Sequence, residues 1–220
     1  MFRNHKVSKI GTTVVLAPKS EIPELSIVFL HGLGDSAEGW LDFFLYQPLF
    51  DRPYRVVLLT APVSPVTRNN GIPMTSWFDV GPNIPDDRIY SFTEANKNAD
   101  IVISTLDSER QILGQSGKLF LGGFSQGAAM SLHIGLDKIS YLSGLFAFSG
   151  YLFKETSLNY PQTPILITHG KDDEVISMEQ AVNSYKRISD LASHKTLYLE
   201  HLNHSIDNRV SDALISFLSS

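Results

Sequence analysis

Short apolar runs alternate with amphipathic segments along most of this chain of 220 residues. The amphipathic segments, at 92–113, 178–188 and 206–218, repeat apolar residues at the period of a helix. Brief, mostly apolar runs are typical of strands that are buried on both faces. The alternation therefore predicts an α/β fold, with helices on both faces of a mostly parallel central sheet. The apolar runs lie at 12–17, 27–30, 56–60, 119–122, 145–148, 165–168 and 196–199.

Length and composition exclude several classes of protein. With 43% hydrophobic and 19% charged residues, the chain fits a single globular domain over residues 1–220 rather than a disordered protein. Its net charge of −5 and its lack of a long basic run argue against nucleic acid as a partner. No apolar stretch is long enough for a signal peptide or a transmembrane segment, so we expect a cytoplasmic protein. The absence of cysteine excludes disulfides and a thiolate nucleophile.

Residues 119–127 read LFLGGFSQG, a buried strand that leads through a turn into a helical run. The turn fits the G-x-S-x-G pattern, in which a serine nucleophile stands between a strand and a helix. Gly123 and Gly127 are needed because so tight a turn leaves no room for side chains two residues from the serine. The helix N-terminus supplies N–H groups and partial positive charge where an oxyanion forms. Ser125 is therefore the predicted nucleophile.

A serine nucleophile needs a base and a carboxylate that orients the base, and in this type of fold the order is Ser, Asp, His. The sequence HGKDDEV at 169–175 follows one predicted strand and supplies three acids at the sheet edge where Ser125 lies. Spacing alone leaves Asp172, Asp173 and Glu174 open as the acid.

Three histidines lie near the same edge: His169, His201 and His204. His201 is still leaving the last predicted strand. His204 directly precedes Ser205, which we expect to cap the final helix, and this is a rigid place from which to reach the serine. His204 is therefore the favoured base, although spacing alone does not decide among the three.

A second oxyanion donor is expected after an early strand. The sequence HGLGD at 31–35 follows a buried strand and is predicted to open a helix. Its glycines let backbone N–H groups approach a negative charge, so we expect the N–H groups of Leu33 and Gln126 to form the oxyanion hole.

Two rival motifs point to bound groups. Residues 32–37 fit the dinucleotide pattern G-x-G-x-x-A, but the next predicted strand ends without the acid that would hold a ribose. His201, His204 and Asp207 are spaced as metal ligands are, but without the H-E-x-x-H order. We therefore expect no metal and no cofactor.

The connection at 61–90 is long, rich in proline and glycine, and without a sustained period. It carries the bulky apolar residues Met74, Trp77 and Phe78. Two interpretations are equally open: these side chains line a substrate groove, or they anchor the connection on the core.

Taken together, these motifs resemble the α/β-hydrolase family of small carboxylesterases, lysophospholipases and acyl-protein thioesterases. The resemblance extends over nearly the whole chain. It rests on FLHGLGD at 29–35, Ala61-Pro62, PVT at 65–67, Asn70-Gly71, Met74, WFD at 77–79, GFSQG at 123–127, HGKDDEV at 169–175 and His204-Ser205.

Carried onto this sequence, the resemblance implies Ser125 as the nucleophile, Asp173 as the acid and His204 as the base. It implies Leu33 and Gln126 as the backbone oxyanion donors. It also places Met74 and the Trp77-Phe78 pair near the acyl groove. The family usually has glycine at positions 128 and 201 and proline at 177, where this chain has Ala128, His201 and Ser177.

The resemblance implies a serine hydrolase that cleaves small esters, lysophospholipids or S-acylated proteins through an acyl-enzyme. Only a short linker separates the predicted strands at 145–148 and 165–168, so we expect no lid domain and an open site. The expected state is a monomer or a weak homodimer. The alternatives are a noncatalytic scaffold that binds a partner through the 61–90 connection, and a serine acyltransferase.

Overall fold

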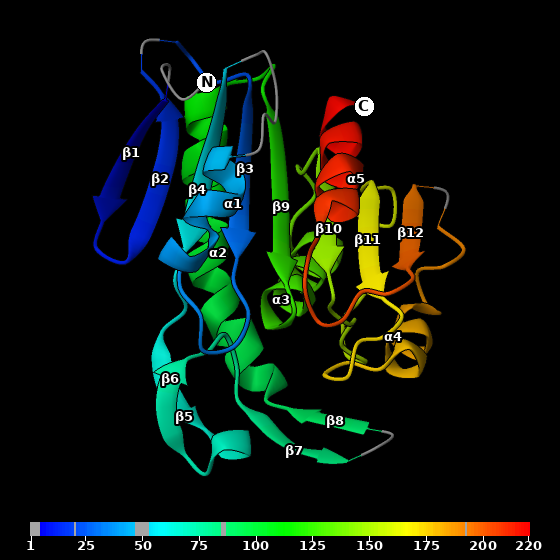
Figure 1. Ribbon diagram of the computed structural model, residues 1–220. Coiled ribbons are helices and arrows are strands. Elements are labelled where there is room, and N and C mark those ends of the chain that lie inside the picture. Colours follow the sequence, from blue (N-terminus) through cyan, green and yellow to red (C-terminus); the bar gives the residue numbers. More distant parts are fainter. Residues whose placement is uncertain (1–4, 20, 47–52, 85–86, 192) are drawn as a thin grey trace.

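The computed structural model describes residues 5–19, 21–46, 53–84, 87–191 and 193–220 (Figure 1). Its central element is an eight-stranded sheet with the order β1-β2-β4-β3-β9-β10-β11-β12. The strands from β4 to β12 in this order pair in parallel, and β2 and β1 extend the sheet antiparallel. The prediction of an α/β fold with a mostly parallel sheet is confirmed. The strands are β1 (His5–Ile10), β2 (Thr13–Pro18), β3 (Leu25–Leu30), β4 (Tyr54–Leu59), β9 (Lys118–Phe124), β10 (Gly144–Phe148), β11 (Ile165–Gly170) and β12 (His194–Leu199).

Helices cover both faces of the sheet (Figure 1). The short helices η1 (Glu38–Trp40) and α1 (Leu41–Tyr46) share one face with α5 (Asn208–Ser219). There Phe44 packs against Phe29 of β3, and Leu214 of α5 belongs to the same buried cluster. The other face carries α2 (Phe92–Leu113), α3 (Gln126–His133) with the turn η3 (Ile134–Lys138), and α4 (Met178–Tyr185). Each face thus buries its own apolar core against the strands.

The final helix begins later than its sequence pattern predicts. Its N-cap is Asp207, whose carboxylate accepts hydrogen bonds from the N–H groups of Arg209 (2.9 Å) and Val210 (3.4 Å). The expectation that Ser205 caps this helix is therefore wrong. A carboxylate reaches two N–H groups of the first turn, and its negative charge suits the helix N-terminus.

The connection between β4 and α2 forms two antiparallel hairpins beneath the carboxyl ends of the parallel strands (Figure 1). One pairs β5 (Val63–Val66) with β6 (Ile72–Thr75) around the turn η2 (Thr67–Asn69), and the other pairs β7 (Val80–Ile84) with β8 (Asp87–Tyr90). Residues 149–164 contain neither a helix nor a strand. Among the described residues, no helix has the length and apolarity needed to cross a membrane.

Candidate active site

Ser125 stands at the junction between β9 and α3, in a backbone conformation that side chains rarely adopt. Its φ is 55° and its ψ is −113°, and its N–H donates to the carbonyl of Phe148 (2.8 Å). A Cβ on Gly127 would lie 2.1 Å from the carbonyl oxygen of Leu30, and one on Gly123 would lie 2.4 Å from the Gly127 backbone. The glycines of the turn are therefore required by close backbone approach, and strain is concentrated at the serine.

His204 connects this serine to a buried acid. Its Nε2 lies 2.9 Å from Ser125 Oγ, and its Nδ1 lies 2.7 Å from Asp173 Oδ2. With the Nδ1 proton donated to the carboxylate, Nε2 is left to accept the serine proton. The three side chains come from the carboxyl ends of β9, β11 and β12, and they meet in the order that a serine nucleophile, base and orienting acid require.

The surroundings of Asp173 favour its charged form. Its side chain is fully buried, and burial by itself raises the pKa of the carboxyl group. The hydrogen bonds from His204 and from the Ile176 N–H (2.8 Å) lower the pKa and outweigh the effect of burial. Together with the nearby His204 and His169 rings, they hold the pKa of Asp173 below its ordinary value. A carboxylate held in this way stays ionised and can stabilise an imidazolium beside it.

The other candidates for acid and base do not reach Ser125. Asp172 and His201 lie near each other on the exposed surface, with His201 Nδ1 3.8 Å from Asp172 Oδ2. Glu174 is exposed as well. His169 is buried, and its Nε2–H donates to the Ile176 carbonyl (2.8 Å), which supports the loop that carries Asp173.

Both expected oxyanion donors face the same pocket as the serine. Leu33 and Gln126 line a pocket of about 320 Å³ together with Ser125 and His204. Among the described residues, neither backbone N–H has a hydrogen-bond partner, so both are available to an oxygen atom in the pocket. The helix after HGLGD begins only at η1, so it is the turn at 32–35, and not a helix N-terminus, that presents Leu33.

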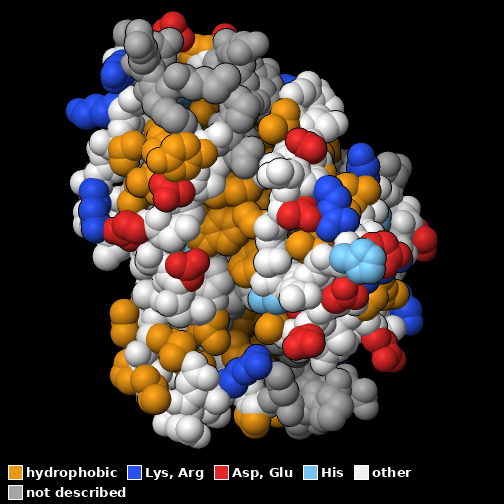
Figure 2. Space-filling model, viewed as in Figure 1, with side chains coloured by type: hydrophobic (Ala, Val, Ile, Leu, Met, Phe, Trp, Pro, Cys, Tyr) orange, Lys and Arg blue, Asp and Glu red, His pale blue; other side chains and the backbone are white. Residues whose placement is uncertain are grey.

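The rest of the pocket wall is largely apolar. Four of its side chains were not expected at the site from the sequence. Phe124 and Val175 lie within the GFSQG and HGKDDEV motifs, which could have indicated them. No sequence signal indicates Val80 or Tyr151. Arg68 and Asp35 are the lysine, arginine or acidic residues that line it. Hydrophobic side chains also gather over the β5–β6 hairpin (Figure 2), where Val63 and Ile72 are 68% and 59% exposed.

The residues predicted to line a substrate groove, Met74, Trp77 and Phe78, lie outside the pocket that contains Ser125. Trp77 and Phe78 are fully buried and, like the half-buried Met74, are not among the residues that line this pocket. For Trp77 and Phe78 the structure supports the interpretation in which they anchor the connection on the core, because Trp77 packs against the His31 ring and Phe78 against the Phe153 ring. Their assignment as substrate-binding residues is corrected. Met74 is only half-buried and stays a proposed substrate-binding residue.

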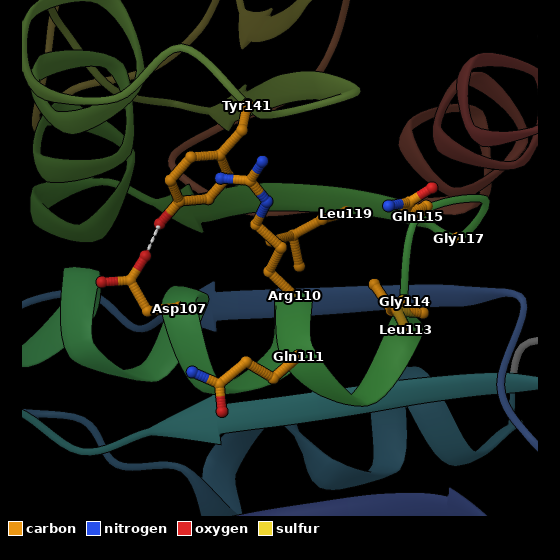
Figure 3. Close-up of a pocket in the computed structure, with 9 residues that line it drawn as sticks. All are labelled: Asp107, Arg110, Gln111, Leu113, Gly114, Gln115, Gly117, Leu119 and Tyr141. Carbon is orange, nitrogen blue, oxygen red and sulfur yellow. Dashed lines mark hydrogen bonds between the residues drawn. The ribbon is translucent and has the colours of Figure 1, made fainter.

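A second cavity, of about 810 Å³, lies at the opposite end of the sheet, where α2 ends and β9 begins (Figure 3). In it the Tyr141 hydroxyl donates to Asp107 (2.5 Å), and the Arg110 guanidinium stacks over the Tyr141 ring at 4.4 Å. It contains none of the predicted catalytic residues. Among the described residues, no cluster of histidine and acidic side chains is arranged to hold a metal ion.

Comparison with known proteins identifies the family of the chain. Residues 11–220 match the phospholipase/carboxylesterase family. The chain is similar to acyl-protein thioesterase 1 of Mycosarcoma maydis, with 35% identity over 188 residues, 76% of this chain and 77% of the relative. It is also similar to acyl-protein thioesterase 1 of Eremothecium gossypii, with 31% identity over 218 residues, 92% of this chain and 90% of the relative.

A solved structure has the same fold. The crystal structure of Zea mays acyl-protein thioesterase 2 superposes with a TM-score of 0.78 at 26% sequence identity, covering 95% of this chain and all of that one.

Proposed function

Because the chain belongs to the phospholipase/carboxylesterase family of α/β-hydrolases, we propose that Ser125, His204 and Asp173 are the catalytic triad of its ester and thioester hydrolysis. The observation that carries the proposal is the continuous hydrogen-bonded line from Ser125 Oγ through His204 to the buried Asp173 carboxylate. The Leu33 and Gln126 N–H groups complete the site as oxyanion donors.

The reaction has two steps. Ser125 Oγ attacks the carbonyl carbon of the acyl group while His204 Nε2 takes its proton. Asp173 stabilises the imidazolium, and the two backbone N–H groups stabilise the tetrahedral oxyanion, each contributing about 3 kcal/mol. His204 then gives the proton to the departing alcohol or thiol. A water molecule, deprotonated by the same histidine, hydrolyses the acyl-enzyme and restores the serine. No metal or cofactor enters either step.

For the substrate we propose S-acylated proteins, with lysophospholipids and small esters as further substrates. Two observations support an acyl chain on a large carrier. The pocket wall is mainly apolar, with Leu33, Val80, Phe124 and Tyr151 among its members. The linker at 149–164 contains neither a helix nor a strand, so no lid domain is inserted at this point of the chain. The relatives named above are acyl-protein thioesterases.

A substrate panel tests this function. It contains p-nitrophenyl esters of increasing acyl length and a palmitoylated peptide thioester, each offered to wild type and to Ser125→Ala. We expect turnover by wild type, with a preference for the thioester, and loss of turnover in the variant. An enzyme variant as active as wild type would show that Ser125 is not the nucleophile. Added alcohol that captures the acyl group in preference to water would show an acyltransferase instead.

For location and assembly we propose the cytoplasm and a monomer or weak homodimer. The chain has no cysteine and so needs no oxidising compartment for disulfides. Light scattering over a concentration series tests the assembly, and a stable higher oligomer would contradict it.

A further inference from the structure

Trp77 lies between the two segments that carry the expected oxyanion donors, and it hydrogen-bonds to both. Its backbone N–H donates to the side-chain oxygen Oε1 of Gln126 (2.9 Å), and its indole N–H donates to the carbonyl oxygen of His31 (2.9 Å). Gln126 is one donor residue, and His31 is two residues before the other, Leu33. We propose that Trp77 is a positioning residue that holds the two halves of the oxyanion hole at a fixed separation. The inference rests on the proposed function.

The Gln126 side chain forms one half of this connection. Besides accepting from Trp77, it donates through Nε2 to the carbonyl of Phe78 (2.7 Å) and to the hydroxyl of Ser76 (3.0 Å). The side chain is buried, and all of these partners belong to one segment, 76–78. A residue whose side chain is held at three points has little freedom to rotate its backbone, so its N–H keeps a fixed direction toward the pocket.

His31 forms the other half. Its Nε2 accepts a hydrogen bond from the N–H of Ala61 (3.0 Å), which leaves the ring proton on Nδ1 to donate to the carbonyl of Gly32. That carbonyl belongs to the same peptide group as the Leu33 N–H, so holding the oxygen on one side directs the N–H to the other. Burial lowers the pKa of His31, and this effect is larger than the opposing effects of the bond to Gly32 and the charge of Asp35. The lowered pKa favours this neutral form.

The burial of Trp77 shows that these bonds are fixed. Trp77 is fully buried, and its ring lies 5.5 Å from that of His31. One bond comes from the backbone N–H of Trp77 and the other from its indole N–H. Because both are buried, they are not exchanged for water, so they set a distance rather than merely add stability. Small errors in donor placement reduce the rate because the donors act on the transition state and not on the bound substrate.

Two variants test the proposal. Trp77→Phe keeps an aromatic ring and the backbone N–H, but it removes the indole N–H together with the five-membered ring. Gln126→Leu removes the side-chain bonds but keeps the backbone N–H. We expect kcat for acylation to fall at least about 10-fold in each, with KM changed less than about threefold. Rates are counted per serine titratable with a fluorophosphonate, so that unfolded protein does not contribute.

A transition-state analogue separates positioning from stability. A trifluoromethyl ketone forms a tetrahedral oxyanion on the serine, so its Ki is expected to rise by the same factor as kcat/KM falls. Ser26→Ala is the matched control, because it removes a buried hydrogen bond of 2.6 Å to Glu109, away from the pocket. We expect it to lower Tm and leave kcat and Ki unchanged.

The outcomes distinguish this inference from the proposed function. If Ser125→Ala is inactive while Trp77→Phe and Gln126→Leu lose only Tm, as Ser26→Ala does, the positioning role is overturned and the proposed function stands. If Ser125→Ala keeps full activity, the proposed function is overturned and this inference with it.

Discussion

The Asp173 carboxylate lies 2.7 Å from Nδ1 of His204 and is completely buried, whereas its neighbour Asp172 is 53% exposed beside His201. Two adjacent acids of the same type thus lie in opposite environments. The Asp173 carboxylate accepts backbone N–H bonds from Val175 (2.9 Å) and Ile176 (2.8 Å) through its other oxygen. These bonds turn its free oxygen toward the histidine, so only one acid of the pair can orient the base.

Asp173→Asn is therefore expected to reduce kcat by about 10³- to 10⁴-fold without unfolding the protein, because an amide cannot stabilise the imidazolium and favours the wrong tautomer. Steady-state kinetics on a p-nitrophenyl ester measure this. Asp172→Asn is the matched control and should stay within about twofold of wild type. Equal losses in the two variants would show that Asp173 has no special role.

His201 occupies a left-handed backbone conformation, with φ 56°, and its side chain is 94% exposed. Glycine adopts this conformation without strain, so His201→Gly is expected to raise the free energy of unfolding by about 0.5 to 1 kcal/mol and leave kcat unchanged. His201→Val should lower it by about 1 kcal/mol, because a branched side chain is disfavoured there. Urea denaturation measures both, and a destabilised glycine variant would contradict the account.

Gly127 brings the start of α3 against the end of β3. Its replacement by alanine would place a Cβ 2.1 Å from the Leu30 carbonyl oxygen, and both atoms belong to regular elements that cannot shift cheaply. We expect Gly127→Ala to lose about 3 kcal/mol of stability and most activity. In Gly11→Ala no atom beyond the neighbouring residues of the chain would lie within 4 Å of the new Cβ, so only the strain at φ 59° is added and activity should be retained. Thermal unfolding and ester hydrolysis compare the two.

The buried His133 side chain is expected to make the stability of the protein depend on pH. It is buried between Asn96 and Thr156, to whose side chains its ring nitrogens hydrogen-bond, each at 3.2 Å. Burial, with Lys138, lowers its pKa to about 4 against the opposing charges of Asp137 and Glu155. The unfolded chain takes up this proton below its ordinary pKa of about 6.5, and the folded chain does not.

Stability is therefore expected to fall as pH is lowered from about 6.5 toward 4, by at most about 3 kcal/mol from this residue. Urea denaturation at several pH values measures the slope in wild type and in His133→Gln, whose amide also carries a donor and an acceptor. The variant should be less sensitive to acid over this range. An identical slope in the two proteins would show that His133 does not remain neutral when folded.

The sheet and the position of Ser125 were predictable because each depends on a strong local signal, whereas the choice of Asp173 among three adjacent acids came only from the family resemblance. Buried parallel strands read as continuous apolar runs, and the serine turn needs glycines at fixed positions. Strand β1 was not predicted, because its residues HKVSKI are mostly polar and exposed at the sheet edge. The hairpins of residues 63–90 were not predicted for a related reason: their strands are only four or five residues long, and three of the four contain proline.

The errors concern tertiary contacts that no local pattern contains. From sequence alone, bulky apolar residues in a loop can either line a groove or anchor the loop. Only the folded structure shows that Trp77 and Phe78 are buried. Ser205 and Asp207 are both good helix caps, and the helix start decides between them. One departure from the family now has an explanation: Ser177, where proline is usual, caps α4, with Ser177 and Gln180 hydrogen-bonding each other's backbone N–H (3.2 Å each).

In the proposed mechanism, Ser125 carries the acyl group during the reaction. Intact-protein and peptide mass spectrometry, after rapid acid quenching with a palmitoylated peptide thioester, tests it directly. We expect a mass increase of one acyl group in wild type, located on the peptide that contains Ser125, and no adduct in Ser125→Ala. Continued turnover by Ser125→Ala, or an adduct on a different residue of an active enzyme, would contradict it.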